Sequence, residues 1–75
     1  MTNSERHPAV VHLMGQFEHS HLPPDLAAIS EACYRLAEQM YNAIDDNPEL
    51  TTGLRKLLEA KDCFVRAAVA NRRET

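Results

Sequence analysis

Lys61 is a cation in a position where the surrounding pattern favours a hydrophobic side chain. It lies between Leu58 and Phe64, and at about 100° per residue it falls within roughly 20° of the centre of a helical apolar stripe. A lysine there can extend its ammonium group to solvent or pair with an acid across a subunit interface. It can also hold an anionic ligand at such an interface.

Charged residues flank this stripe within roughly 60° of arc. Arg55 and Glu59 are four positions apart, as are Asp62 and Arg66, and ion pairs at this spacing stabilise a helix by only about 0.2–0.5 kcal/mol each. One interpretation is a solvated face with salt bridges. The other is that Arg55 or Arg66 binds phosphate, for which the planar guanidinium is well suited.

The first 21 residues contain all four histidines, at positions 7, 12, 19 and 21. His19 and His21 could contribute to a zinc site, but a tetrahedral site needs further ligands and no cysteine is near in sequence. We therefore predict no metal site. These rings can instead orient the segment or stack on a base or an aromatic partner. Phe17, in the same segment, can plug a groove on a neighbouring subunit or stack on a nucleobase.

The residue types needed for catalysis are not grouped in this sequence. Cys63 has no histidine beside it, so the base that would activate a nucleophilic thiol is missing. The sequence has no glycine-rich phosphate loop and no serine elbow. We therefore predict that the protein is not an enzyme and uses no cofactor.

A chain of 75 residues makes one small domain. Its core would supply no more than about 3–5 kcal/mol, so staples or partners are expected. With 44% hydrophobic and 25% charged residues, the composition favours a folded, helical chain over a disordered one. No apolar run approaches the roughly 20 residues of a membrane span, and the two cysteines form no CxxC pair. We expect a cytosolic protein with reduced thiols and no membrane contact.

The net charge of −3 is unevenly distributed. Residues 1–50 carry two cations and eight acids, a balance of −6, and residues 51–75 carry six cations and three acids, a balance of +3. A general duplex-DNA binder would be basic overall, which argues against a nucleic-acid partner. The basic half can serve a small anion or the acidic half of a neighbouring subunit.

Hydrophobic spacing and helix breakers predict three helices. A short one over residues 7–14, capped by Asn3 or Ser4, ends at Gly15. An extended connector leads to Pro24, which suits a first helical residue, and apolar residues then recur at spacings of three and four up to about residue 44. After the turn at residues 45–48, a last helix begins near Pro48 or residue 51 and ends near residue 71.

The two long helices predict an all-α fold, an antiparallel two-helix hairpin preceded by a short helix and arm. We assign residues 1–22 to the arm and residues 23–75 to the hairpin, which would oligomerise and bind ligand. Each apolar stripe spans more arc than one partner helix can cover. The hairpin is therefore expected to be completed by homo-oligomerisation.

Several motifs together resemble a bacteriophage family of small helical-hairpin proteins, the anti-CBASS and anti-Thoeris sponges. The resemblance covers roughly residues 17–71. It is carried by Phe17-x-x-x-His21-Leu-Pro-Pro, by Leu36-Ala37, by Pro48-Glu-Leu-Thr and, most specifically, by Leu54-Arg-Lys-Leu-Leu-Glu-Ala-Lys-Asp-x-x-Val65-Arg66-Ala-Ala-Val.

The resemblance implies a homo-oligomer, often a hexamer, in the cytoplasm of an infected bacterium. Such sponges bind cyclic dinucleotide, cyclic trinucleotide or cyclic ADP-ribose-type immune signals without cutting them, so the defence effector is not activated. In this family, aromatic side chains between subunits stack on bases, and cations or backbone groups hold phosphates.

Transferred to this chain, the resemblance suggests a set of ligand-binding residues. An arm tyrosine of some family members is absent, as are lysines early in their first long helix. Aromatic rings of the arm and cations of the last helix would take those roles, with Lys61 and Arg66 first among the phosphate ligands. The candidates are Phe17, His19, His21, Arg55, Lys56, Lys61 and Arg66.

Two other functions remain open from the sequence. The hairpin oligomer could act as a protein-interaction or inhibitor module, with its oppositely charged halves used for packing or docking. It could also be a small DNA-binding protein that reads DNA with residues 55–73. An oligomer whose melting temperature rises with ligand would favour the sponge, whereas salt-dependent retention on heparin would favour the DNA binder.

Overall fold

The computed structural model describes residues 6–74, with side chains up to residue 72. This part of the chain folds into three helices and contains no strand, which confirms the all-α prediction. No helix in it is both long and apolar enough to cross a bilayer. The helices are α1 (Pro8–Gly15), α2 (Pro24–Ala43) and α3 (Pro48–Glu74).

The start of α1 differs from the expected one. Asn3 and Ser4, the expected caps, lie outside the described residues, and the residue that caps α1 is His7, whose Nδ1 accepts a hydrogen bond from the Ala9 N–H at 3.0 Å. Pro8 follows as the first helical residue, where its missing N–H is not needed. Gly15 is the last residue of α1, as expected.

The long helices begin as their prolines predict. Pro24 opens α2, with Asp25 in the first turn where the helix dipole favours an acid. Pro48 opens α3, and Asn47 before it caps the helix, because its Oδ1 accepts a hydrogen bond from the Leu50 N–H at 2.9 Å. The helix then continues to Glu74, three residues beyond the expected end.

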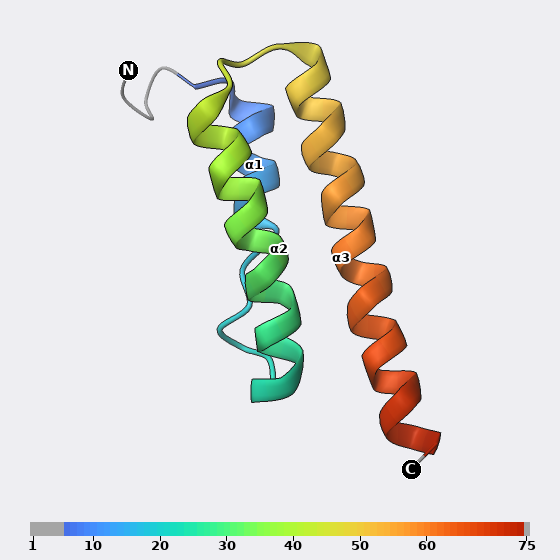
Figure 1. Cartoon of the computed structure of the whole chain (residues 1–75). Coiled ribbons are helices and arrows are strands. Elements are labelled where there is room, and N and C mark those ends of the chain that lie inside the picture. Colours follow the sequence, from blue (N-terminus) through green and yellow to red (C-terminus); the bar gives the residue numbers. More distant parts are fainter. Residues whose placement is uncertain (1–5, 75) are drawn as a thin grey trace.

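The three helices pack against one another. In Figure 1, α2 and α3 lie side by side and run in opposite directions from the short connector at residues 44–47, with α1 behind them. α1 packs more extensively on α3 than on α2. It therefore covers one flank of the α2–α3 pair.

One hydrophobic core unites the arm with the long helices. Val10, Leu13 and Phe17 from the first 22 residues share this core with α2 and α3. The two segments defined from the sequence therefore depend on each other for burial of apolar surface. The buried members contributed by the long helices are Cys33, Ala37, Leu50 and Leu54.

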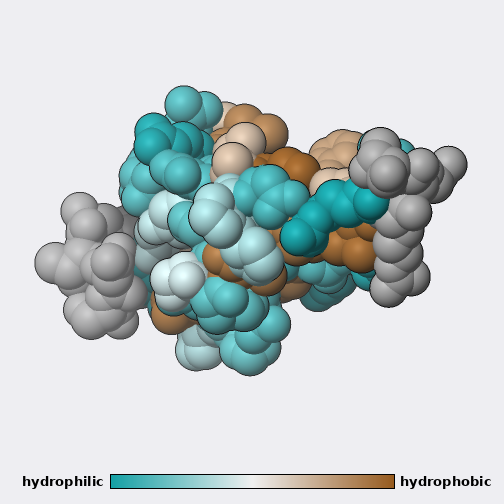
Figure 2. All heavy atoms as spheres, turned by 90° about the horizontal axis from the view of Figure 1, so that it is seen from below, coloured by the Kyte–Doolittle hydropathy of each residue, from teal (hydrophilic) through white to brown (hydrophobic). Residues whose placement is uncertain are grey.

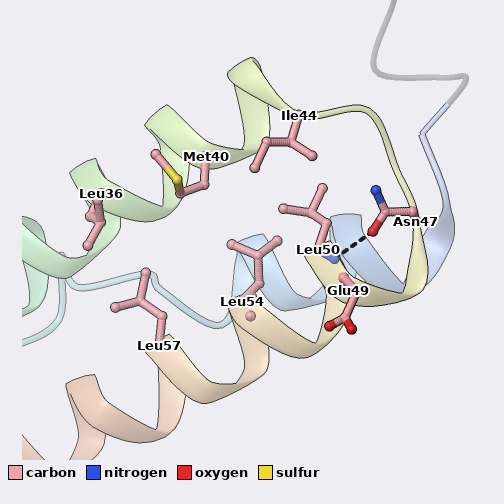
Figure 3. Close-up of a pocket in the computed structure, with 9 residues that line it drawn as sticks. Leu36, Met40, Ile44, Asn47, Glu49, Leu50, Leu54 and Leu57 are labelled. Carbon is pink, nitrogen blue, oxygen red and sulfur yellow. Dashed lines mark hydrogen bonds between the residues drawn. The ribbon is translucent and has the colours of Figure 1, made fainter.

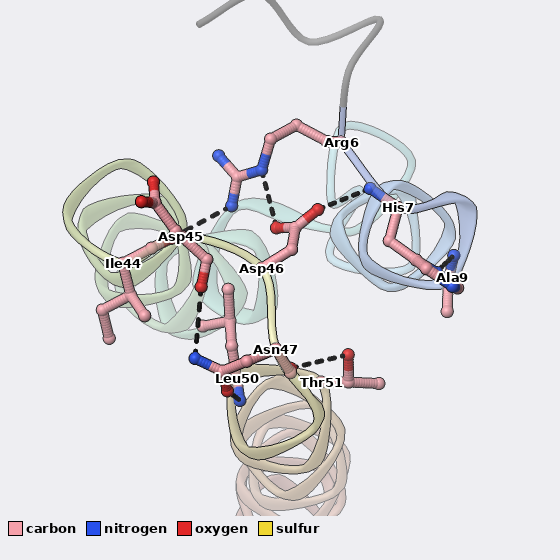
Figure 4. Close-up of polar contacts among 9 residues, drawn as sticks. All are labelled: Arg6, His7, Ala9, Ile44, Asp45, Asp46, Asn47, Leu50 and Thr51. Atoms are coloured by element: carbon pink, nitrogen blue, oxygen red, sulfur yellow. Dashed lines mark hydrogen bonds and ion pairs between the residues drawn. The ribbon is translucent and has the colours of Figure 1, made fainter.

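A polar clamp fixes the start of α1 to the α2–α3 connector (Figure 4). Arg6 Nε lies 2.7 Å from Asp46 Oδ1, and its Nη2 donates to the Ile44 carbonyl at 3.2 Å. The His7 N–H donates to the second Asp46 oxygen, and this bond together with Arg6 lowers the pKa of Asp46. The Arg6 guanidinium also lies 3.8 Å from the centre of the Tyr41 ring, a cation–π contact.

Candidate functional site

A groove between α3 and the segment after α1 contains three of the residues selected from the sequence. His21 lines it from the segment, and Lys61 and Arg66 line it from α3. Its volume is about 390 Å³, within the range of small-molecule sites. The rest of the lining comes from Gln16, Glu18, Leu22, Asp62 and Val65.

Short-range turns and one buried ring hold the 16–22 segment in place. The N–H groups of Phe17 and Glu18 donate to the carbonyls of the last turn of α1, at 3.2 and 3.3 Å. The Leu22 N–H donates to the His19 carbonyl at 3.1 Å. Phe17 anchors the segment in the core, where none of its surface is exposed. Because α2 then starts at Pro24, the segment is short and its path is set at both ends.

Lys61 is the least exposed cation of the groove. Only 12% of its side chain is accessible, and its Nζ lies 2.8 Å from Asp62 Oδ1, a carboxylate that is 48% exposed. The sequence left open whether this lysine pairs with an acid or meets a ligand. It pairs with the next residue in its own chain, and the ammonium still lines the groove.

Arg66 is the cation of the groove that no carboxylate neutralises within residues 6–72. Its Nη2 lies 3.3 Å from Cys63 Sγ. The expected Asp62–Arg66 pair is not formed, because Asp62 contacts Lys61 instead, and Arg55 and Glu59 form no ion pair in this part of the chain either. The guanidinium of Arg66 is exposed and can offer two parallel N–H donors to a phosphate.

The groove also contains acids that the sequence analysis did not include. Glu18 and Asp62 balance Lys61 and Arg66 in formal charge, and a hydrogen bond from the Ser20 N–H lowers the pKa of Glu18. A phosphate would therefore meet Arg66 directly but would have to compete with Asp62 for Lys61. The i to i+1 pairing was missed because the helical pattern directed attention to neighbours four residues apart.

The other candidates lie elsewhere. Arg55 lines a separate groove of about 380 Å³ that includes His7, Thr51 and Thr52. Lys56 is exposed and lines neither groove. His19 is half-buried, with its ring centre 6.0 Å from that of Tyr34 and its Nδ1 3.4 Å from the Phe17 carbonyl.

The structure corrects the expectation for Phe17. This ring was expected to plug a neighbouring subunit or to stack on a base, but it is completely buried in the core of its own chain. A ring without exposed surface has no face to offer a ligand. The segment that carries it is wrapped against α1 and α3 rather than extended as an arm.

An apolar groove lies between α2 and α3 (Figure 3). Its volume is about 410 Å³, and Figure 3 shows the side chains of both helices pointing into it. Leu36, Met40 and Ile44 remain exposed there, although their spacing of three and four along α2 puts them on the same stripe as the buried Cys33 and Ala37. The lining is completed by Asn47, Glu49, Leu50, Gly53, Leu54 and Leu57.

Groups of metal-binding side chains are not found in the described part of the chain: no three histidine, cysteine, aspartate or glutamate residues come together. Comparison of the chain with family models, with curated proteins and with solved structures found no match. The site is therefore interpreted from its own geometry.

Proposed function

We propose that this protein is a phage anti-defence sponge: a homo-oligomer of helical hairpins that binds cyclic di- or trinucleotide, or cyclic ADP-ribose-type, immune signals without degrading them. It would act in the cytoplasm of the infected bacterium, where lowering the free signal keeps CBASS or Thoeris effectors inactive. The resemblance of residues 17–71 to the hairpin sponges supports this proposal, as does the groove at Lys61 and Arg66.

The observation that carries the proposal is the meeting of His21, Lys61 and Arg66 in one groove. His21 lies 40 residues from Lys61 and 45 residues from Arg66 in sequence, and it comes from the segment after α1, whereas both cations come from α3. Arg66 supplies a planar set of donors and Lys61 a compact charge, the two forms of phosphate contact that proteins use most. Leu22 and Val65 supply apolar surface for a ribose or base, and the His21 ring can stack on the base.

A sponge releases its bound ligand chemically unchanged, whereas an enzyme releases a product. Mass action requires it to compete with the effector for the signal, so tight binding without turnover is sufficient. An incomplete groove on one subunit suits such a ligand, because a second subunit can enclose it and remove more of its surface from water.

Isothermal titration of the purified protein tests the proposal. The panel consists of cyclic dinucleotides, cyclic trinucleotides and cyclic ADP-ribose isomers, and bound ligand is recovered after heat denaturation and identified by mass. We expect tight binding of at least one member, returned intact. Absence of binding by every member, with the oligomer intact, would rule out the sponge, and a cleaved product would show catalysis instead.

The exposed apolar groove favours one alternative, a protein-interaction or inhibitor module. Contiguous apolar surface on a small protein commonly marks a protein contact. Such a module would bind no member of the panel and would retain one specific host or phage protein on an affinity column. A DNA-binding protein would be distinguished by steeply salt-dependent retention on heparin.

A further inference from the structure

One flank of the α2–α3 pair, opposite α1, carries a row of exposed and half-buried apolar side chains. We call it the Phe64 face and define it as Leu36, Met40 and Ile44 of α2 with Gly53, Leu57, Ala60 and Phe64 of α3. Phe64 is 55% exposed, and the three α2 side chains are between 36% and 45% exposed. Figure 2, which views the molecule from below, shows hydrophobic surface that reaches solvent between hydrophilic regions.

Gly53 has no explanation within a single chain. A glycine inside a helix is less favourable than alanine by about 1 kcal/mol. Its φ is not positive, so no unusual backbone conformation requires it. A Cβ added to it would meet nothing within 4 Å, so no close contact inside the chain requires it either. Gly53 therefore leaves an open space on the surface of α3 that a side chain from outside the subunit can fill.

Small and large residues alternate along α3 on this face in a symmetric pattern. Gly53, Leu57, Ala60 and Phe64 are separated by four, three and four positions, and they fall within roughly 60° of arc. When a second copy of α3 is laid antiparallel on the first, with the two helices crossing at the midpoint between Leu57 and Ala60, each small residue of one copy lies opposite a large residue of the other. Gly53 then faces Phe64, and Leu57 faces Ala60.

We infer that the Phe64 face is a two-fold interface with a second copy of this chain, in which the two α3 helices cross antiparallel and Phe64 of each copy packs against Gly53 of the other. Gly53 lines the apolar groove between α2 and α3, so the ring of the second copy enters that groove. This inference rests on the homo-oligomer of the proposed function but not on its ligand.

The available area suits such a contact. Taking roughly 200 Å² for a large apolar side chain, the four exposed ones leave about 350 Å² uncovered. Exposed apolar patches of roughly 300–600 Å² on a small protein commonly mark a protein contact. Each copy supplies both the knob, which is Phe64, and the hole, which is the space at Gly53, as two-fold symmetry requires.

The test is a swap of the knob and the hole, followed by sedimentation velocity and light scattering over a range of concentrations. Phe64→Ala removes the knob, and Gly53→Phe fills the hole with a ring that collides with Phe64 of the other copy. Each single variant should weaken self-association by at least about 30-fold, as loss of a central aromatic anchor does. The double variant Gly53→Phe with Phe64→Ala should regain most of it, because every large residue again faces a small one.

Two controls keep the result interpretable. Val11→Ala removes an apolar side chain of similar exposure, 47%, from the other side of the molecule and should leave the particle mass unchanged. Circular dichroism should show unchanged helix content in the single variants, because Phe64 is exposed and position 53 has open space.

Three results would overturn the inference: a wild-type chain that stays monomeric, single variants that leave the particle mass unchanged, or a double variant as dissociated as the single ones. Ligand titration of the same variants separates this inference from the proposed function. An intact interface without ligand binding would leave the inference standing and remove the sponge.

Discussion

At the scale of single residues, the balance between Lys61, Asp62 and Arg66 decides how strongly the groove attracts an anion. The Asp62 carboxylate lies 2.8 Å from the ammonium of Lys61, whereas Arg66 forms no ion pair among the described residues. Arg66 should therefore make the first contact with a phosphate. Lys61 should contribute only after its bond to Asp62 has been exchanged for one to the ligand.

Neutralising Asp62 should tighten ligand binding. Asp62→Asn removes the competing charge at nearly constant size, and because an exposed ion pair is worth about 0.2–1 kcal/mol, we expect a gain in affinity of up to roughly fivefold. Arg66→Ala should cost at least about tenfold, the value of a charge-assisted hydrogen bond. Isothermal titration with whichever panel member binds the wild type measures both changes.

Glu59→Gln is the matched control for the Asp62 variant, since it makes the same chemical change at an exposed position of α3 outside the groove. It should leave the affinity unchanged. An equal gain in both variants would mean that overall charge, rather than the groove, attracts the ligand.

Phe17 is a structural residue in this fold, and its removal should affect stability first. Phe17→Ala deletes a fully buried ring, a change that costs about 3–5 kcal/mol in well-packed cores and so approaches the whole stability of a small domain. Denaturant titration followed by circular dichroism measures the loss. Val11→Ala, at an exposed position, should change the free energy of unfolding by less than about 0.5 kcal/mol.

A milder variant separates stability from binding at this position. Phe17→Leu keeps most of the apolar volume and leaves a folded chain whose ligand affinity can be measured. Unchanged affinity per folded molecule would confirm the structural role. A large loss of affinity in a fully folded Phe17→Leu protein would return the ring to the binding site.

At the scale of the elements, the clamp between Arg6, His7 and Asp46 connects α1 to the connector before α3. The pKa of Asp46 lies below its ordinary value because the His7 N–H and Arg6 stabilise its charged form. The stabilisation is therefore complete above the ordinary pKa of 3.8. It is lost as the pH falls through the lower pKa of the folded state.

Asp46→Asn should consequently destabilise the protein at pH 7 and make little difference well below pH 3.8. The free energy of unfolding, measured by denaturant titration at several pH values, gives the difference between wild type and variant. Asp45→Asn, one position earlier and exposed, should show no such pH-dependent difference. A gap between wild type and Asp46→Asn that persists at the lowest pH would show that the charge of Asp46 is not what holds the clamp.

The helix boundaries were predictable where proline and asparagine define them. Pro24 and Pro48 begin their helices as expected, and the turn before Pro48 ends α2. The start of α1 was not predictable, since histidine is an unusual cap and its role depends on the following proline. The end of α3 was placed too early, because the polar residues after Asn71 contain no helix breaker.

The site was predictable in part, for reasons that differ between its residues. Lys61 was identified because its position inside an apolar stripe depends only on nearby residues of the same helix, and packing of the helices does not change it. The burial of Phe17 and the position of His21 over α3 could not be predicted, because both depend on which flank α1 covers. Contacts between residues far apart in sequence determine which flank α1 covers, and the spacing of residues along a single helix does not predict such contacts.

At the scale of the whole molecule, the two flanks of the α2–α3 pair have different characters. α1 covers one flank, and the 16–22 segment forms the groove with Lys61 and Arg66 of α3. The other flank carries the Phe64 face. A dimer formed through the Phe64 face fills the apolar groove but leaves the groove at Lys61 and Arg66 uncovered in each copy, so a ligand pocket closed between subunits requires a second kind of contact and an assembly larger than two chains.

The clamp also has a consequence for the order in which a new chain folds. Arg6 and Asp46 are separated by 40 positions, more than half of the chain. A helix as short as α1 is not stable alone, so α1 must wait for the connector and α3 to be synthesised before it can pack. The groove, which depends on the path of the segment after α1, consequently forms only after synthesis has passed residue 66, the last residue that lines it.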